Sequence, residues 1–92
     1  MTEDSVQVWL VERTFAGDEQ VLELIYATPD GSRYLRKIRT PSSMGPMGDG
    51  PPTAAIEVSP DKLVAVDDAE TRDQYATEAE RMTERHEPDD AV

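Results

Sequence analysis

The chain has 92 residues and a net charge of −11 at neutral pH, from 20 acidic and 9 basic residues. This length predicts one domain (1–92), with a modest and mostly aliphatic core because only one Trp, one Phe and three Tyr are present. The absence of cysteine excludes disulfides, thiolate metal sites and cysteine nucleophiles, and no apolar run is long enough to predict a membrane span.

The first expected element is a β-strand over residues 5–14. Its apolar residues alternate between two faces, with Val6, Val8 and Leu10 on one and Trp9 and Val11 on the other. Residues 1–4 lack the basic start of a signal peptide, which favours a cytoplasmic location. We expect a short loop to return the chain antiparallel, with Leu10 near Leu24.

The segment 20–40 predicts a β-hairpin around which the rest of the chain is organised. A strand rich in β-branched and aromatic residues ends at Ala27, and a second strand runs over 33–40. The intervening Pro, Asp and Gly predict a three-residue loop, a type I turn closed by a glycine bulge. This loop places Thr28 opposite Ser32.

That register predicts two faces for the hairpin. A core face carries Leu22, Leu24, Tyr26, Tyr34 and Ile38. A mixed face carries Val21, Glu23, Ile25, Leu35, Lys37 and Arg39. Glu23 then lies opposite Lys37 as a pair of opposite charge. A slip of one residue would mix the faces, so the loop determines much of the specificity of the pairing.

Residues 41–52 form the one low-complexity segment, with four prolines and three glycines, and predict a long flexible loop. A fourth strand is expected over 53–58. Residues 63–66 fit either a short fifth strand or the lead-in to a helix.

The helix is expected to begin at the N-cap Asp67, with Glu70 in capping-box position, and to end near His86. Its apolar residues form a narrow stripe, Tyr75, Ala79, Met82 and His86, flanked by Ala69 and Ala76. A polar acidic tail, 87–92, follows. The predicted fold is therefore α+β: an antiparallel sheet of four or five strands with one C-terminal helix. Which sheet face the helix covers is left open.

The composition is typical of a halophile's cytoplasmic protein, because acids are abundant and lysine is limited to Lys37 and Lys62. Three segments, VWLVERTF (8–15), LIYATPDGSRYLRKIR (24–39) and AVDDAETRDQYATEAERM (65–82), together with the acidic tail, resemble a family of small uncharacterised proteins of halophilic archaea. The resemblance implies source, compartment and single-domain size, and it implies no functional residue.

A local inversion of charge is the first candidate site. Four of the nine basic residues fall within seven positions: Arg33, Arg36, Lys37 and Arg39. With Ser42, Ser43 and the glycines of the following loop, they are candidates for binding a phosphate or carboxylate. The alternative is that surplus acids such as Glu23 neutralise them as ordinary surface pairs.

Self-association is the second candidate. If the helix covers the core face, the mixed face keeps an apolar patch that a homodimer would bury. The predicted interface residues are Trp9, Val11, Val21, Ile25 and Leu35. Nucleic acid is a poor partner because the net charge repels phosphate. His86 is weighed as a helix-capping residue, and no catalytic, metal or cofactor site is expected.

The sequence alone does not determine the function. It favours a small interaction or binding protein, self-associating through an apolar sheet face, over an enzyme. The alternative is a protein that binds an anion or a nucleotide through the basic strand 33–39 and the loop 41–52. The two hypotheses differ in whether the bases are free of carboxylate partners.

Overall fold

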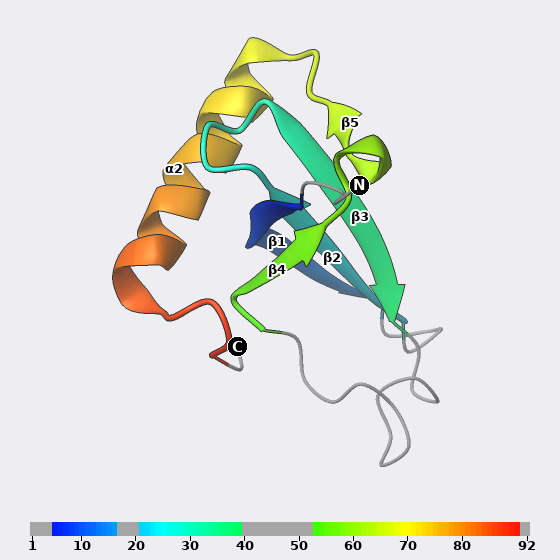
Figure 1. Cartoon of the computed structure of the whole chain (residues 1–92). Coiled ribbons are helices and arrows are strands. Elements are labelled where there is room, and N and C mark those ends of the chain that lie inside the picture. Colours follow the sequence, from blue (N-terminus) through cyan, green and yellow to red (C-terminus); the bar gives the residue numbers. More distant parts are fainter. Residues whose placement is uncertain (1–4, 17–20, 40–52, 91–92) are drawn as a thin grey trace, which may run out of the picture.

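The computed structural model describes residues 5–16, 21–39 and 53–90, apart from the side chains of Ala16 and Arg39 (Figure 1). Five strands form one antiparallel sheet in the order β4-β1-β2-β3-β5, and one helix follows. This is the predicted α+β fold, and the fifth strand exists. The elements are β1 (Val6–Ala16), β2 (Val21–Ala27), β3 (Arg33–Arg39), β4 (Ala55–Val58), the 3₁₀ turn η1 (Pro60–Lys62), β5 (Val64–Ala65) and α2 (Ala69–Arg85).

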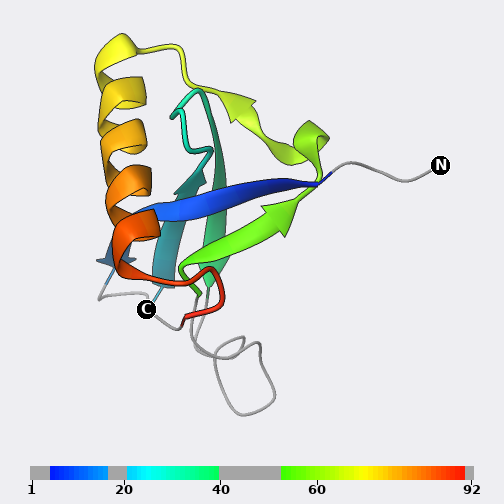
Figure 2. The same cartoon turned by 60° about the vertical axis from the view of Figure 1, so that its left-hand side comes forward.

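The sheet is curled because its two edge strands are neighbours in the sequence. β4 lies at one edge and β5 at the other, and residues 59–63 join them. A flat sheet of five strands would separate its edges by about 19 Å. A short link containing a 3₁₀ turn barely reaches that far. The curl brings the edges together, and Figure 2 shows β4, η1 and β5 on the side of the β2–β3 hairpin away from α2.

The concave side of the curled sheet, here called the inner face, holds the main core. Val8, Leu24 and Tyr26 are fully buried there and Leu10 is nearly so. Partly buried side chains from the surrounding strands and loop close the cluster: Val6, Leu22, Ile56, Val58 and Leu63. The even-numbered alternation in β1 and β2 predicted these positions, and the structure confirms them.

The opposite side, here called the helix face, is covered by α2. Trp9 is 5% exposed and packs in one cluster with Ala54, Ala55 and the fully buried Ala79 of α2. Small side chains at these three positions let the helix approach the tryptophan closely. The predicted apolar stripe of α2 is thereby confirmed at Ala79, and Tyr75 lies beside Tyr34 of β3, with the ring centroids 6.2 Å apart.

The predicted register between β2 and β3 is wrong by one residue. Ala27 pairs with Tyr34, and Tyr26 pairs with Leu35. The loop has four residues because the Asp30 carboxylate accepts hydrogen bonds from the backbone N–H and hydroxyl of Ser32, at 3.0 and 2.8 Å. Ser32 is thus held inside the loop, and Arg33 takes the place opposite Thr28, whose N–H donates to the Arg33 carbonyl.

The shift moves the residues of β3 to the opposite faces. Tyr34 and Ile38, predicted on the core face, lie on the helix face instead, and Leu35 lies on the inner face opposite Tyr26. Glu23 lies opposite Ile38 rather than Lys37. The predicted pairing of β1 with β2 is also displaced, since Leu10 lies opposite Tyr26 and a bulge interrupts the ladder between Leu10 and Glu12.

Helix α2 begins one residue later than predicted. Its N-cap is Asp68, whose side chain accepts hydrogen bonds from the backbone N–H and hydroxyl of Thr71, at 2.9 and 2.8 Å. These bonds hold the pKa of Asp68 below its usual value. The helix ends as expected, with His86 as C-cap. No helix in the described part of the chain combines the length and apolarity needed to cross a bilayer.

The acidic tail is packed rather than free over its first residues. The N–H groups of Ala54 and Ala55 donate to the carbonyls of Asp90 and Pro88, at 2.8 and 2.9 Å. These bonds tie the segment after α2 to the start of β4. The loop predicted over 41–52 lies outside the described residues.

Candidate interaction site

The predicted basic cluster lies on β3, which has an incompletely paired edge. β2 pairs with β3 from Tyr34 to Arg39, but β5 pairs only with Arg33 and Tyr34. Beyond Tyr34, no described strand lies along the outer edge of β3. The edge is open because β5 is two residues long and the chain before it turns away as η1.

The hydrogen-bonding alternation determines which backbone groups face outward at this edge. Arg33 is bonded to Thr28 of the hairpin, so every second residue after it, Leu35 and Lys37, also points its N–H and C=O toward β2. The backbone groups of Arg36 and Ile38 therefore point away from β2. The Ile38 side chain is 50% exposed.

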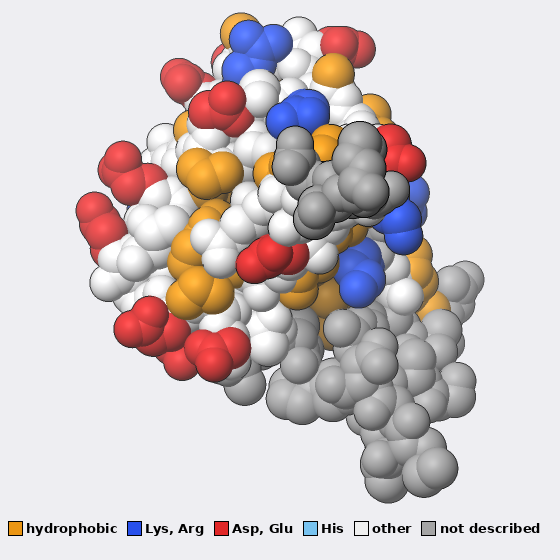
Figure 3. Space-filling model, viewed as in Figure 1, with side chains coloured by type: hydrophobic (Ala, Val, Ile, Leu, Met, Phe, Trp, Pro, Cys, Tyr) orange, Lys and Arg blue, Asp and Glu red, His pale blue; other side chains and the backbone are white. Residues whose placement is uncertain are grey.

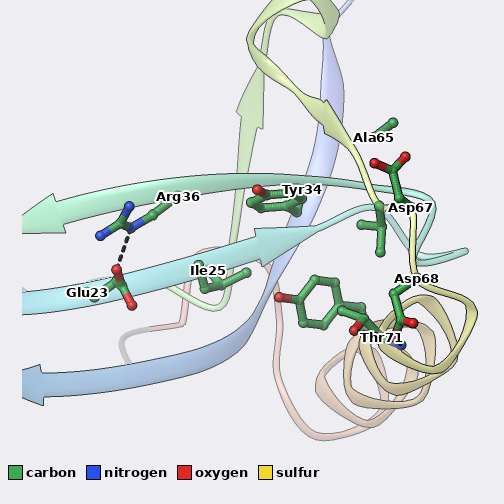
Figure 4. A pocket seen from close by; sticks show the side chains of 10 residues that line it. Glu23, Ile25, Tyr34, Arg36, Ala65, Asp67, Asp68 and Thr71 are labelled. Atoms are coloured by element: carbon green, nitrogen blue, oxygen red, sulfur yellow. Dashed lines mark hydrogen bonds and ion pairs between the residues drawn. The ribbon is translucent and has the colours of Figure 1, made fainter.

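The bases of β3 divide between the two faces of the sheet. Arg33 and Lys37 fall on the inner-face side of the strand, where Arg33 is exposed and Lys37 is half-buried. Within the described residues, neither makes an ion pair with a carboxylate. Arg36 falls on the helix face and pairs with Glu23 across the strand (Figure 4). The cluster is thus one neutralised arginine and two unpaired bases, and Ser42 and Ser43 lie outside the described residues, as does the Arg39 side chain.

A pocket of about 440 Å³ lies on the helix face, between β3 and the start of α2. Figure 4 shows Arg36 and Glu23 at one end of it, Tyr34 in the middle and Asp67, Asp68 and Thr71 at the other end. Its lining is completed by apolar side chains of Ile25, Ala65 and Val66, and by Tyr75. Register reasoning from the sequence missed this pocket because it placed Tyr34 on the wrong face.

The polar groups of the pocket are mostly engaged in holding the fold. Glu23 pairs with Arg36, and Asp68 caps α2. Burial raises the pKa of the Tyr75 hydroxyl above its usual value, helped by the negative charges of Glu12 and Glu23, so this hydroxyl stays protonated at neutral pH. The Thr71 hydroxyl in the lining donates a hydrogen bond to the carboxylate of Asp68, which already serves as the N-cap of α2.

The predicted dimer residues lie mostly under the helix or at partial depth in the sheet. Trp9 and Ile25 are 5% and 7% exposed, and Val11, Val21 and Leu35 are intermediate. Trp9 and Val11 pack in the cluster beside α2, whereas Leu35 lies on the inner face, so these residues do not share one exposed sheet face. The homodimer itself stays a prediction.

The model of the family of unknown function DUF7967 matches residues 2–92. The chain belongs to this family. No curated protein and no solved structure is significantly similar to it.

The match to DUF7967 covers β3 and also η1 and β5, the elements beside its outer edge. The family is of unknown function, so membership assigns no activity to this chain. Within the described residues, this DUF7967 chain has an open strand edge with two unpaired bases, next to a pocket in which Glu23, Arg36 and Asp68 are already engaged.

Proposed function

We propose that this DUF7967 protein is an interaction protein that binds an extended segment of a partner along the open edge of β3. The observation that carries the proposal is the pairing of β5 with only the first two residues of a seven-residue strand. Backbone groups at such an edge provide affinity for an added strand, and the alternating side chains provide specificity. The exposed Ile38 adds apolar area to that edge.

The setting we infer is the cytoplasm of a halophile. The inference is supported by the net charge of −11 and by the presence of only two lysines among nine basic residues. In molar salt the Debye length falls to about 3 Å, so the repulsion between surface acids is screened. Binding at the edge then depends on groups in direct contact rather than on long-range attraction.

The test is selection of binders from a randomised library of displayed peptides in molar KCl. Bound peptides should shift the amide resonances of Arg36 and Ile38 and slow their hydrogen exchange. Ile38→Pro should abolish binding, because proline lacks the outward N–H. Ile38→Ala is the matched control, since it loses the same side chain and keeps the N–H. Binders that map to α2 or to the pocket, with Arg36 and Ile38 unaffected, would contradict the proposal.

A second copy of the chain is another occupant to test at this edge, and it would give a homodimer paired through strand edges rather than through the sheet face expected from the sequence. Sizing with light scattering in molar KCl distinguishes the two cases. A mass near twice 10.2 kDa, lost in Ile38→Pro but kept in Ile38→Ala, would assign the edge to self-association. A monomer leaves it to a different partner.

A further inference from the structure

The charges along β3 indicate what kind of partner segment the edge would bind. Although acids outnumber bases by 20 to 9, Arg33 and Lys37 have no carboxylate partner within the described residues. Elsewhere on the molecule acids dominate, and Figure 3 shows acidic side chains along the side formed by α2. Other described bases, such as Arg13 and Arg85, also lack a carboxylate partner, but Arg33 and Lys37 lie on the same side of an edge strand that is paired only at its first two residues.

The alternation of side chains along β3 determines where the carboxylates of a bound partner would lie. Arg33 and Lys37 share the inner-face side of β3, with Leu35 between them. An added strand places every second side chain on that side, beside Lys37. Its other side chains fall on the helix face, beside Arg36 and Ile38. Arg36 is already neutralised by Glu23, so apolar contact with Ile38 is what this face offers.

We infer that the partner segment is an acidic extended peptide, in which Asp or Glu alternates with apolar residues. The inference rests on the proposed function and adds to it the identity of the partner. The acids lie on the inner-face side, against Lys37 and toward Arg33, and the apolar residues lie beside Ile38. A second copy of β3 fits poorly in this place, because antiparallel pairing of this strand with itself puts bases opposite bases.

The experiment compares three synthetic peptides of equal length, in which valine alternates with glutamate, glutamine or lysine. Binding is measured by titration in molar KCl, so that contact pairs rather than the net charge decide the outcome. We expect the glutamate peptide to bind about tenfold more tightly than the glutamine peptide, which corresponds to about 1.4 kcal/mol, and the lysine peptide to bind most weakly. The amides of Arg36 and Ile38 should report each complex.

Variants then assign the preference to its residues. Lys37→Gln and Arg33→Gln should each remove part of the glutamate preference and leave the glutamine peptide unaffected. Lys62→Gln is the matched control, because Lys62 is exposed on η1, outside the open stretch of the edge. Circular dichroism of each variant checks that it is folded.

The outcomes separate the two proposals. Equal binding of the glutamate and glutamine peptides at Arg36 and Ile38 would overturn the acidic partner and leave strand addition intact. A glutamate preference unchanged in both Lys37→Gln and Arg33→Gln would overturn the assignment to these bases. If none of the three peptides perturbs the edge amides, the acidic partner is wrong, and the library selection decides whether the edge binds anything. An oligothymidylate that competes with the glutamate peptide would assign the bases to nucleic acid instead.

Discussion

At the scale of single residues, Gly31 connects the hairpin to the helix. Its φ of +74° is a conformation that other residues adopt with strain. A Cβ built at this position would lie 2.1 Å from the Arg72 carbonyl oxygen and 2.8 Å from the Ala76 nitrogen, both in the backbone of α2. The absence of a side chain therefore permits both the turn and the contact between the loop and the helix.

Gly31→Ala should destabilise the protein by more than the about 1–2 kcal/mol that the left-handed backbone alone costs an L-residue, because the clash is with backbone atoms. Urea unfolding measures the loss. Gly31→Asn separates the two causes, since asparagine tolerates this conformation but still carries a Cβ. Pro29→Ala, in the exposed part of the same loop, is the control and should cost under about 1 kcal/mol. A mild effect of Gly31→Asn would show that the helix moves aside.

Asp30 stabilises the same loop through its charge. Hydrogen bonds from the Thr28 hydroxyl and from the N–H and hydroxyl of Ser32 lower the pKa of its carboxyl from 3.8 to about 2. Because the folded-state pKa is the lower one, the stabilisation is complete above pH 3.8 and disappears as the pH falls through about 2. With solvent screening allowed for, it amounts to about 1 kcal/mol.

Asp30→Asn should therefore lower the free energy of unfolding by about 1 kcal/mol at neutral pH. The difference from wild type should become small as the pH approaches about 2, where the wild-type carboxyl is also protonated. Urea unfolding at a series of pH values measures it. Asp61→Asn, an exposed acid in η1, serves as the control. An offset between Asp30→Asn and wild type that does not change with pH would assign the role of Asp30 to geometry rather than charge.

At the scale of elements, the strands and the turn of the β2–β3 hairpin could be predicted from the sequence, but the register between the strands could not. The strands, the turn at Pro29 and the glycine were predictable from residue types. The register was not, because Asp30 has two possible uses: closing a three-residue loop or retaining Ser32 within a four-residue one. That choice moved Tyr34 to the helix face, so the pocket beside α2 could not be predicted, although the strand carrying the bases could.

The start of α2 presents a similar choice between Asp67 and Asp68. Both are exposed acids before the helix, and both have a polar residue three positions on, Glu70 or Thr71. Thr71 decides in favour of Asp68 because its N–H and its hydroxyl both donate to that carboxylate. The sequence pattern is satisfied by either residue, so the position could not be resolved without the backbone.

Asp68→Ala should lower the melting temperature by several degrees, because it removes the N-cap of the only α-helix in the described residues. Asp67→Ala is the matched control and should leave the temperature nearly unchanged. Thermal unfolding followed by circular dichroism makes the comparison. Equal effects of the two substitutions would mean that general charge near the helix dipole matters more than the specific cap.

At the scale of the whole molecule, the charge of −11 makes stability depend on salt. The free energy of unfolding should rise as KCl increases from low to molar concentration, since screening reduces the repulsion among surface acids. Glu80 and Glu84 are exposed and one turn apart in the last half of α2, where negative charge also opposes the helix dipole. Changing both to Gln should raise low-salt stability by about 0.5 kcal/mol and flatten the dependence.

Chemical unfolding across a KCl series measures both quantities. Thr77→Gln with Thr83→Gln, exposed in the same helix, keeps the charge unchanged and serves as the control. A wild-type protein equally stable at low and molar salt would remove the physical basis for assigning it to a saline cytoplasm.

The short link between the two sheet edges also dictates an order of assembly. β1, β2 and β3 form consecutive hairpins, so they can pair through contacts that are local in the sequence. β4 and β5 are expected to join the sheet together, because residues 59–63 link them directly. Pairing of β4 with β1 brings β5 close to β3, and loss of either of these two strand pairs should weaken the other. The two edges thus behave as a single cooperative unit. Ile56→Ala in β4 should accelerate hydrogen exchange at the Val66 amide, which bonds to the Ser32 carbonyl across the molecule, as much as exchange within β4 itself.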